Sequence, residues 1–289
     1  MTNRWMVLMT VAAALLAVGP LPAAAQEVQV TGPLAGEPAV RHMRMYREGR
    51  IQLTPVVSFT LQDEFSRTLF TGLQASYHFV DWLGIGLWGA FGAANIDTDL
   101  TDQVQKKGTT RDRNALSLPT GRLFPDQIAT MSWAAAAQLN FIPLRGKLSL
   151  FQKLHVDTDF FIFGGVAAVG IEERASVTDG STTCPGAPPV NAQPGDDPCV
   201  ASQVARESRI AIAPTFGVGL NFYLNDFLAL MLEWRGLPFA WNTHGFDVHG
   251  GANDGPDGVI DEDDRDFHFN HMVSLGFSFI LPTEAKISD

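Results

Sequence analysis

The chain has 289 residues, and its 31 Asp and Glu outnumber its 20 Lys and Arg, which gives a formal net charge of −11. Such an acidic chain has little with which to neutralise phosphates, so we expect no nucleic acid among its partners. The length suits one large domain or two small ones.

The first 25 residues have the features of a secretory signal peptide. Arg4 supplies a positive start, Met6 to Leu16 is an apolar run, and Ala23 to Ala25 offers small residues for cleavage. This run is too short and wrongly flanked for a membrane span. No later stretch has the roughly 20 consecutive apolar residues that a membrane helix needs. We therefore expect a signal peptide at 1–25, a periplasmic lead-in at 26–49, the main domain at 50–282 and a periplasmic tail at 283–289.

The lead-in is basic, because it ends in Arg41, Arg44, Arg47 and Arg50. Two interpretations of these arginines stay open. They form a short solvated linker, or they contact an anionic leaflet or an acidic partner in the periplasm.

Alternation of large apolar residues with small or polar ones recurs through the main domain. In RIAIAPTFGVGLNFYL, for example, Ile210, Ile212 and Phe216 alternate with Ala211, Ala213 and Thr215. A period of two over such lengths predicts strands. The eight stretches that show it are Ile51–Leu61, Leu69–Phe79, Leu83–Gly92, Met131–Phe141, His155–Gly170, Arg209–Leu224, Leu228–Arg235 and Phe267–Leu281.

The connections between these strands alternate strictly in kind. Tight connections at 80–82 and 225–226, and a moderate one at Ile142 to Leu154, fall on one side. Long polar ones at 97–127, 172–208 and 242–266 fall on the other side, together with the short connection at 62–67. An even strand number with tight periplasmic turns and longer outer loops is typical of a transmembrane β-barrel. We predict an all-β fold, an eight-stranded antiparallel barrel in the bacterial outer membrane, with its large apolar face toward lipid.

A secreted β-sandwich with packed apolar faces is the alternative fold. It would explain the alternation but would not require the rhythm of short and long loops.

The segment GRIQLTPVVSFTLQDEFSRTLFTGLQASYHFVDWLGIGLWGAFG, Gly49 to Gly92, resembles a family of uncharacterised outer-membrane β-barrels of myxobacteria and related δ-proteobacteria. The matching features are the Gly-Arg lead-in, the LTP strand start, the YHF strand end and the WLGIGL restart. KLHVDTDFFIFGGVAAVG and DEDDRDFHFNHMVSLGFSFILP resemble its fifth and closing strands. The resemblance implies an outer-membrane barrel, in some relatives part of gliding-motility or envelope machinery, and implies no particular activity.

Two cysteines, Cys184 and Cys199, lie in a Pro- and Gly-rich segment. In an exported chain we expect them to form one disulfide. Two free thiols are the alternative.

The acidic loop GGANDGPDGVIDEDDRD, Gly250 to Asp266, resembles part of a calcium-binding loop. The spacing places Asn253 first, Asp257 fifth, Val259 seventh, Asp261 ninth and Asp264 twelfth. The third position is Gly255, which has no side-chain ligand, and the twelfth is Asp where Glu is usual. We hypothesise weak Ca²⁺ binding as the sole cofactor, against a solvated acidic loop without cofactor.

Charged residues on the strands predict a polar network inside the lumen. Glu233 and Arg235 share the inward face of one strand, and His155, Asp157 and Asp159 share a face of another. Arg facing lipid near the midplane costs about 2–4 kcal/mol, so pairing inside is favoured. A structural plug is the preferred interpretation over an ion path.

Catalysis finds little support in the sequence. His244, Asp247, His249, His268 and His271 cluster near the last long loop, but no nucleophile or paired acid accompanies them. We therefore expect no enzyme. The favoured function is a structural or anchoring outer-membrane protein with acidic loops, in contact with outer-membrane lipid and with other envelope or motility proteins. The alternatives are a narrow channel and an outer-membrane hydrolase.

Overall fold

The computed structural model describes residues 47–61, 63–108, 116–117, 121, 124–150, 154–176 and 206–284, all within one compact unit, His42–Asp289. The expected signal peptide, most of the lead-in, both cysteines and all but the first two residues of the tail lie outside these residues. The expectations for them therefore stay predictions. No helix among the described residues is long and apolar enough to cross a membrane.

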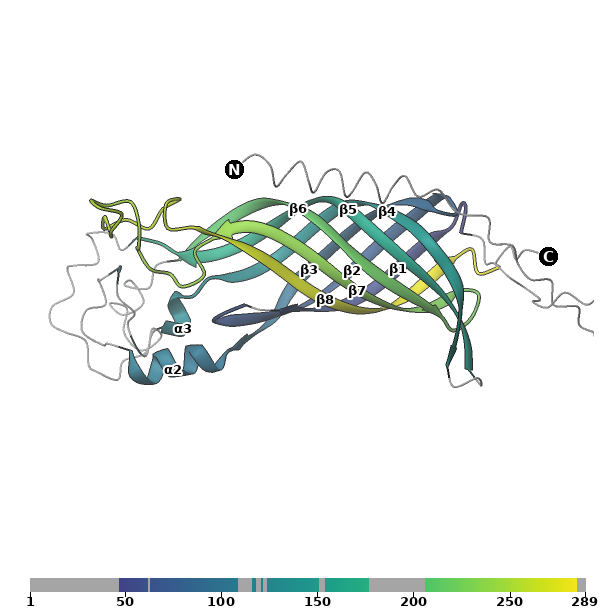
Figure 1. The fold of residues 1–289 in the computed structure, drawn as a ribbon, viewed down its shortest axis with the longest axis horizontal. Coiled ribbons are helices and arrows are strands. Elements are labelled where there is room, and N and C mark those ends of the chain that lie inside the picture. The colour runs from purple at the N-terminus through teal and green to yellow at the C-terminus, as the bar shows by residue number, and fades with distance from the viewer. Residues whose placement is uncertain are drawn as a thin grey trace, which may run out of the picture. The chain divides into compact units, whose positions relative to one another are not determined.

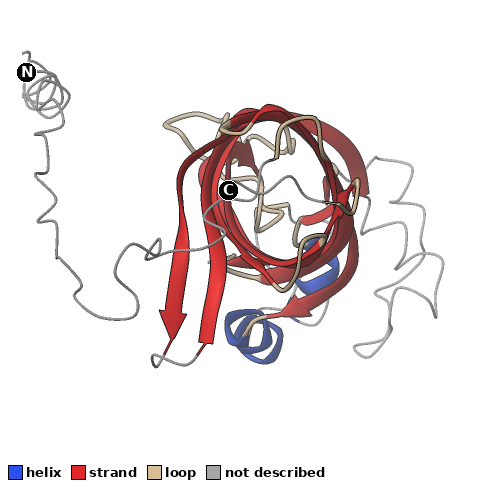
Figure 2. Ribbon diagram, turned by 90° about the vertical axis from the view of Figure 1, so that its right-hand side faces the viewer, coloured by secondary structure: helices blue, strands red, loops and turns tan. Residues whose placement is uncertain are grey.

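Eight antiparallel strands form one closed ring, and this confirms the predicted barrel (Figures 1 and 2). Each strand pairs with the next along the chain, and β8 returns to pair with β1. The strands are β1 (Ile51–Leu61), β2 (Ser66–Val80), β3 (Leu83–Asp97), β4 (Thr130–Leu150), β5 (Leu154–Arg174), β6 (Arg206–Tyr223), β7 (Leu228–Trp241) and β8 (Asp266–Leu281).

The large apolar side chains point outward, as the alternation predicts. On β6, Ile210 and Ile212 are 60% and 69% exposed, whereas Ala213 and Thr215 are 1% exposed. Exposed Val, Ile, Leu and Phe side chains recur on the outer face of every strand. Every strand of the closed ring pairs with a neighbour on each side, and the outer surface of the ring is apolar, as the membrane requires.

The predicted connection Ile142 to Leu154 is wrong. Strands β4 and β5 continue through most of it, with pairing out to Leu150↔Leu154, and only residues 151–153 separate them. Pro143 looked like a turn residue but lies at an irregularity of the ladder between Phe141 and Leu144, where the missing N–H is tolerated. Because β3 pairs with β4 only as far as Phe141, the end of this hairpin extends beside the ring (Figure 2).

Two helices occupy the first long connection, where none was predicted: α2 (Asp99–Lys107) and α3 (Phe124–Gln127). Helix α2 is polar almost throughout, so it has no apolar stripe for the sequence to reveal. Thr101 anchors α2 by donating to the carbonyl of Phe65 at 2.6 Å. Phe124 of α3 is fully buried and packs edge-on against Phe65 at 5.2 Å between ring centroids. The outer end of the barrel therefore carries folded structure.

The two barrel ends differ as the loop rhythm predicts. The tight turns after β2 and β6 lie at the end where Arg50 donates to the carbonyls of Asp226 (2.8 Å) and Pro282 (2.8 and 3.2 Å). This end holds the approach to β1 and the exit from β8, so it is the periplasmic end. Helices α2 and α3 and the described residues of the long connections lie at the other, outer end (Figure 1).

Candidate functional site in the barrel lumen

A buried ion pair occupies the middle of the lumen. Glu233 and Arg235 project inward from β7, and both side chains are fully buried. Arg235 donates to Oε1 of Glu233 from Nη2 at 2.8 Å and from Nε at 3.1 Å. It also donates to Gln138 Oε1 at 2.8 Å and to Thr215 Oγ1 at 3.1 Å. A charge removed from water needs this many partners, because an unpaired one would cost several kcal/mol.

Two aromatic rings complete the surroundings of the Arg235 guanidinium. Its carbon lies 4.5 Å from the ring centroid of Trp88 and 4.3 Å from that of Phe163. Both distances are within the range of cation–π attraction. The "central cluster" of Glu233, Arg235, Gln138, Trp88 and Phe163 therefore draws on β3, β4, β5 and β7 and fills the lumen at this level.

A second ion pair lies near the periplasmic end. Arg47, just before β1, turns its side chain into the lumen and pairs with Asp159 of β5 at 2.6 Å. Tyr223 donates its hydroxyl to Asp159 at 2.7 Å, and Arg47 lies over the Tyr223 ring at 5.2 Å. Arg47 also donates to Gln52 Oε1 at 3.3 Å. The "periplasmic cluster" of Arg47, Asp159, Tyr223 and Gln52 therefore ties the residues just before β1 to the barrel wall.

A small polar cavity of about 10 Å³ lies near both clusters, lined by side chains that include Arg47, Gln74, His78 and Asn140. This volume suits about one water molecule. The cavity borders the periplasmic cluster through Arg47 and Gln52, and its lining residue Asn140 accepts from Gln138 of the central cluster at 2.8 Å.

The predicted lumen residues therefore fall into different places. Glu233 and Arg235 form the central cluster, and Asp159 joins the periplasmic one. Asp157 lies on β5 opposite Tyr223 and Lys147, at the periplasmic end. The side chain of His155 lies outside the described residues.

Sequence reasoning missed the role of Arg47, which was expected in the periplasm and is 2% exposed. It also missed the aromatic rings that flank Arg235. Trp88 is a large residue among Gly84, Gly86 and Ala90 on the inward face of β3, and that contrast was the available signal. No such contrast marks Phe163, because Phe161 and Ile171 share the inward face of β5.

A third polar cluster lies at the outer end. Glu173 is 4% exposed and accepts from Arg209 (2.6 and 3.2 Å), from Arg265 (3.1 Å) and from the backbone N–H of Asn242 (3.1 Å). These groups join the ends of β5, β6, β7 and β8. The cluster ties the strands together where the long loops begin.

The candidate calcium residues are engaged within their own loop. Asp264 is 1% exposed and accepts the backbone N–H groups of Val248 (2.6 Å), His249 (3.0 Å) and Asp261 (3.3 Å). Asp257 accepts from the N–H of Val259 at 2.8 Å. Among the described residues, no three His, Cys, Asp or Glu side chains are grouped to hold a metal ion. Calcium binding stays a prediction, which calorimetry with added Ca²⁺ tests.

The histidines near the last loop do not converge on one place. His244 stacks on Phe246 with centroids 5.1 Å apart, and burial lowers its pKa although Asp266 and Asp264 act in the opposite sense. His249 faces Asp254 at 3.2 Å. His268 contacts Trp241, whereas His271 contacts Trp234 and Phe269. The part of the chain that the structure describes gives no positive evidence of catalysis.

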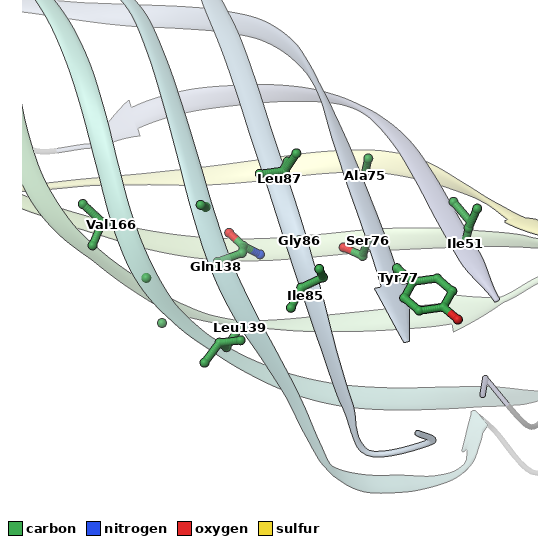
Figure 3. A pocket seen from close by; sticks show the side chains of 13 residues that line it. Ile51, Ala75, Ser76, Tyr77, Ile85, Gly86, Leu87, Gln138, Leu139 and Val166 are labelled. Atoms are coloured by element: carbon green, nitrogen blue, oxygen red, sulfur yellow. The ribbon is translucent and has the colours of Figure 1, made fainter. Parts of the chain in front are cut away.

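A shallow apolar depression of about 710 Å³ lies on the outer face of β2 to β5 (Figure 3). Small residues on the outward faces, Ala75, Ala137 and Gly164, form its floor between larger neighbours such as Tyr77, Leu87 and Val166. Its lining is continuous with the exposed apolar band, so it belongs to the surface that hydrocarbon covers.

The closed ring, the apolar exterior and the polar ion pairs inside define a transmembrane β-barrel. Single-chain bacterial barrels with an even strand number, tight periplasmic turns and long outer loops are proteins of the outer membrane. The chain is accordingly an outer-membrane β-barrel protein.

Comparisons with protein families and with curated proteins find no match. Among solved structures, the N-terminal β-barrel domain of Pseudomonas aeruginosa OprF is 8% identical, with 82% of this chain and 100% of that chain covered and a TM-score of 0.41. OprG of P. aeruginosa is 11% identical, with coverages of 82% and 97% and a TM-score of 0.36. Neisserial surface protein A is 7% identical, with coverages of 80% and 95% and a TM-score of 0.34. The assignment of the fold stands on the strand pairing itself.

Proposed function

We propose that this protein is a non-enzymatic anchor of the cell envelope, a closed barrel that holds folded elements on both sides of the outer membrane. The observation that carries the proposal is the set of buried ion pairs in the lumen, where the central and periplasmic clusters join side chains from several strands. A barrel whose interior is packed with paired charges is suited to rigidity and poorly suited to transport.

The elements outside the membrane support an anchoring role. At the periplasmic end, β4 continues nine residues beyond Phe141, its last residue paired with β3. The edge of this part of β4 that faces away from β5 has no strand beside it in the described chain. An unpaired edge is a common place for a protein partner to bind. The resemblance of Gly49–Gly92 to myxobacterial barrels supports a partner in envelope or gliding-motility machinery.

Single-channel recording of the protein in planar bilayers tests the closed lumen. We expect no resolved conductance steps. Discrete steps would instead favour the narrow channel. Hydrolysis assays comparing the wild type with His244→Ala and His249→Ala test the remaining alternative, and we expect no activity in any of them.

Photo-crosslinking in living cells tests the anchor itself. A photoreactive residue at Leu144, which is 64% exposed near the start of the periplasmic hairpin, is expected to give one discrete crosslinked species. The same residue at Ile212, on the lipid-facing surface, is the control and is expected to give none. Absence of any species from Leu144 would contradict the proposal.

A further inference from the structure

The wall of the barrel is incompletely paired between β6 and β7. Their ladder runs from Tyr223↔Ala229 to Phe216↔Gly236 and stops there. Both strands nevertheless continue outward, and each keeps its other neighbour: β6 pairs with β5 out to Arg206, and β7 pairs with β8 out to Trp241. A seam without a backbone ladder therefore runs between residues 211–215 of β6 and residues 237–241 of β7.

Two prolines explain why the ladder stops. Continuing the register two residues beyond Phe216↔Gly236 would place Pro214 opposite Pro238. Neither residue has an N–H to donate, and proline inside a sheet removes a ladder hydrogen bond. The seam is thus encoded by the sequence at the same level on both strands.

The seam lies within the apolar band. Ile210 and Ile212, beside it on the outer face of β6, are among the most exposed apolar residues of the protein. At its inner end, the ring of Phe216 contacts those of Trp234 and Phe269 at centroid distances of 6.2 and 5.8 Å. At its outer end, Arg209 of β6 donates to the carbonyl of Ala240 of β7 at 3.0 Å. Side chains therefore bound the seam at both ends.

The side of the seam that faces the lumen is apolar. Leu237, Phe239 and Trp241 of β7 are all buried there, and the facing residues of β6 are the small Ala211 and Ala213. A hydrocarbon chain would meet apolar side chains inside and lipid outside. The unpaired backbone groups would cost several kcal/mol each in hydrocarbon, so an occupant that also carries hydrogen-bonding atoms fits better than a purely apolar one.

We propose that this seam binds an outer-leaflet lipid, with its acyl chain against the apolar side chains of β6 and β7 and its ester, amide or hydroxyl groups toward the unpaired backbone groups and Arg209. This goes beyond the anchoring role and is independent of it. The seam is the site, and an amphiphile with at least one acyl chain is the ligand class.

Fluorescence quenching by phosphatidylcholine brominated at mid-chain tests the proposal. Two variants are purified from outer membranes, one that keeps Trp241 and one that keeps Trp88. In each variant, Phe replaces the other four of the five tryptophans Trp82, Trp88, Trp133, Trp234 and Trp241. Any contribution of Trp5 is common to both. Trp88 is the matched control, because it is equally buried in the lumen (2% against 4% exposed) and lies on a strand paired on both sides at that level.

When the variants are reconstituted in vesicles of the brominated phosphatidylcholine, we expect Trp241 to be quenched at least twofold more strongly than Trp88. Equal quenching of the two reporters would overturn the proposal. If Trp241 is quenched no more than Trp88 and the protein also crosslinks to a second copy through β6, the second copy is the occupant and the proposal is overturned.

The double variant Pro214→Val/Pro238→Val restores both missing N–H groups and is expected to seal the seam. In a variant that still folds, quenching of Trp241 should fall to the level of Trp88, and persistence of the excess would overturn the proposal. A second measurement needs no change at the prolines. Adding phosphatidylcholine to the wild type in detergent micelles should slow amide hydrogen exchange of Ile212 and Ala240, whose N–H groups face the seam, at least threefold, and unchanged exchange would also overturn it.

Discussion

At the scale of single residues, the lumen shows how a membrane barrel accommodates full charges. Arg235 is fully buried yet has a carboxylate, an amide oxygen, a hydroxyl and two aromatic rings around its guanidinium. The guanidinium presents five donors in a fixed plane, so it can use partners from several strands at once. Gln138 and Thr215 thereby connect β4 and β6 to a charge that β7 carries.

Removing one partner of this pair is expected to be costly. Glu233→Leu leaves Arg235 buried without its counter-ion, and we expect a loss of about 3–5 kcal/mol in the free energy of unfolding. Urea unfolding of the protein in detergent micelles, followed by tryptophan fluorescence, measures it. The double variant Glu233→Leu/Arg235→Met is expected to recover most of the loss, and a single variant as stable as the wild type would contradict this account.

Asp63, in the turn between β1 and β2, provides a pH-dependent prediction. Burial raises its pKa to about 6, although Thr60 and Arg67 act in the opposite sense. Because the folded state holds this proton more tightly than the unfolded state, stability is lost as the pH rises from about 4 to 6. Asp63→Asn should therefore raise the free energy of unfolding at pH 8 by about 1 kcal/mol. This value is smaller than the full ~1.4 kcal/mol per pKa unit would give, because solvent screens the partly exposed carboxyl group.

The measurement compares urea midpoints of the wild type and Asp63→Asn at pH 8 and pH 4. At pH 4 the folded wild type is protonated at Asp63, so the two proteins should converge. A constant difference at both pH values would show that the titration of Asp63 is not its source.

At the scale of elements, the β4–β5 hairpin separates what folds the barrel from what extends beyond it. The inner parts of both strands belong to the ring, whereas the segment from Gly146 to Thr158 pairs mainly with itself. The Arg145↔Asp159 pair is its natural base, where Asp159 also meets Arg47. The hairpin is thus dispensable for closure of the barrel.

Replacing Gly146–Thr158 by Asn-Gly should leave the barrel folded. These two residues favour a tight turn between antiparallel strands, and Arg145 and Asp159 already lie opposite each other. We expect the free energy of unfolding, measured by urea titration, to change by no more than about 0.5 kcal/mol. This is the usual range for changes away from a core. Failure of the shortened chain to fold would show that the hairpin is part of the folding unit.

The element scale also shows what the sequence reveals and where it stops. Period-two alternation located all eight strands and their lipid-facing sides, because a membrane barrel contrasts its two faces strongly. The same rule fails beyond the membrane: Pro143 and Gly146 suggested a turn where a two-stranded ribbon continues. Helix α2 escaped because its polar sequence gains stability from tertiary contacts such as Thr101 with Phe65.

The lumen was predictable only in part for a related reason. Alternation identifies which residues point inward, so Glu233 and Arg235 were expected to pair. It does not say which inward residues from distant strands meet, and Arg47 lies outside every alternating stretch. Arg47 and Tyr223 are the partners of Asp159, and they meet it only because the whole ring closes.

At the scale of the whole molecule, the two ends of the barrel give a test of orientation. The described residues of the long loops, with α2 and α3, lie at the outer end, and the β4–β5 hairpin lies at the other. An epitope tag inserted between Asp254 and Gly255 should be accessible to antibody on intact cells. The same tag in place of residues 151–153 should be accessible only after the outer membrane is permeabilised. The reverse pattern would contradict the assigned orientation.

Closure of the ring gives a second prediction at this scale. Because every strand of the closed ring pairs with two neighbours, the ring has no edge strand from which detergent can begin to unfold it. We expect the unboiled protein to migrate differently from the boiled protein on SDS gels, together with a strand-rich circular dichroism spectrum. Identical migration would indicate that the ring is not closed in the isolated protein.

The buried pair of Glu233 and Arg235 has a consequence for how β7 finds its alignment during assembly. Beyond this pair, Leu237, Phe239 and Trp241 face the lumen and Pro238 and Ala240 face lipid, so both faces of that segment are apolar. A slip of one residue there would expose little that lipid rejects, whereas the same slip at Arg235 would turn a guanidinium into hydrocarbon. The two charges thus fix the register of β7, including the segment where hydrophobicity alone would allow two registers.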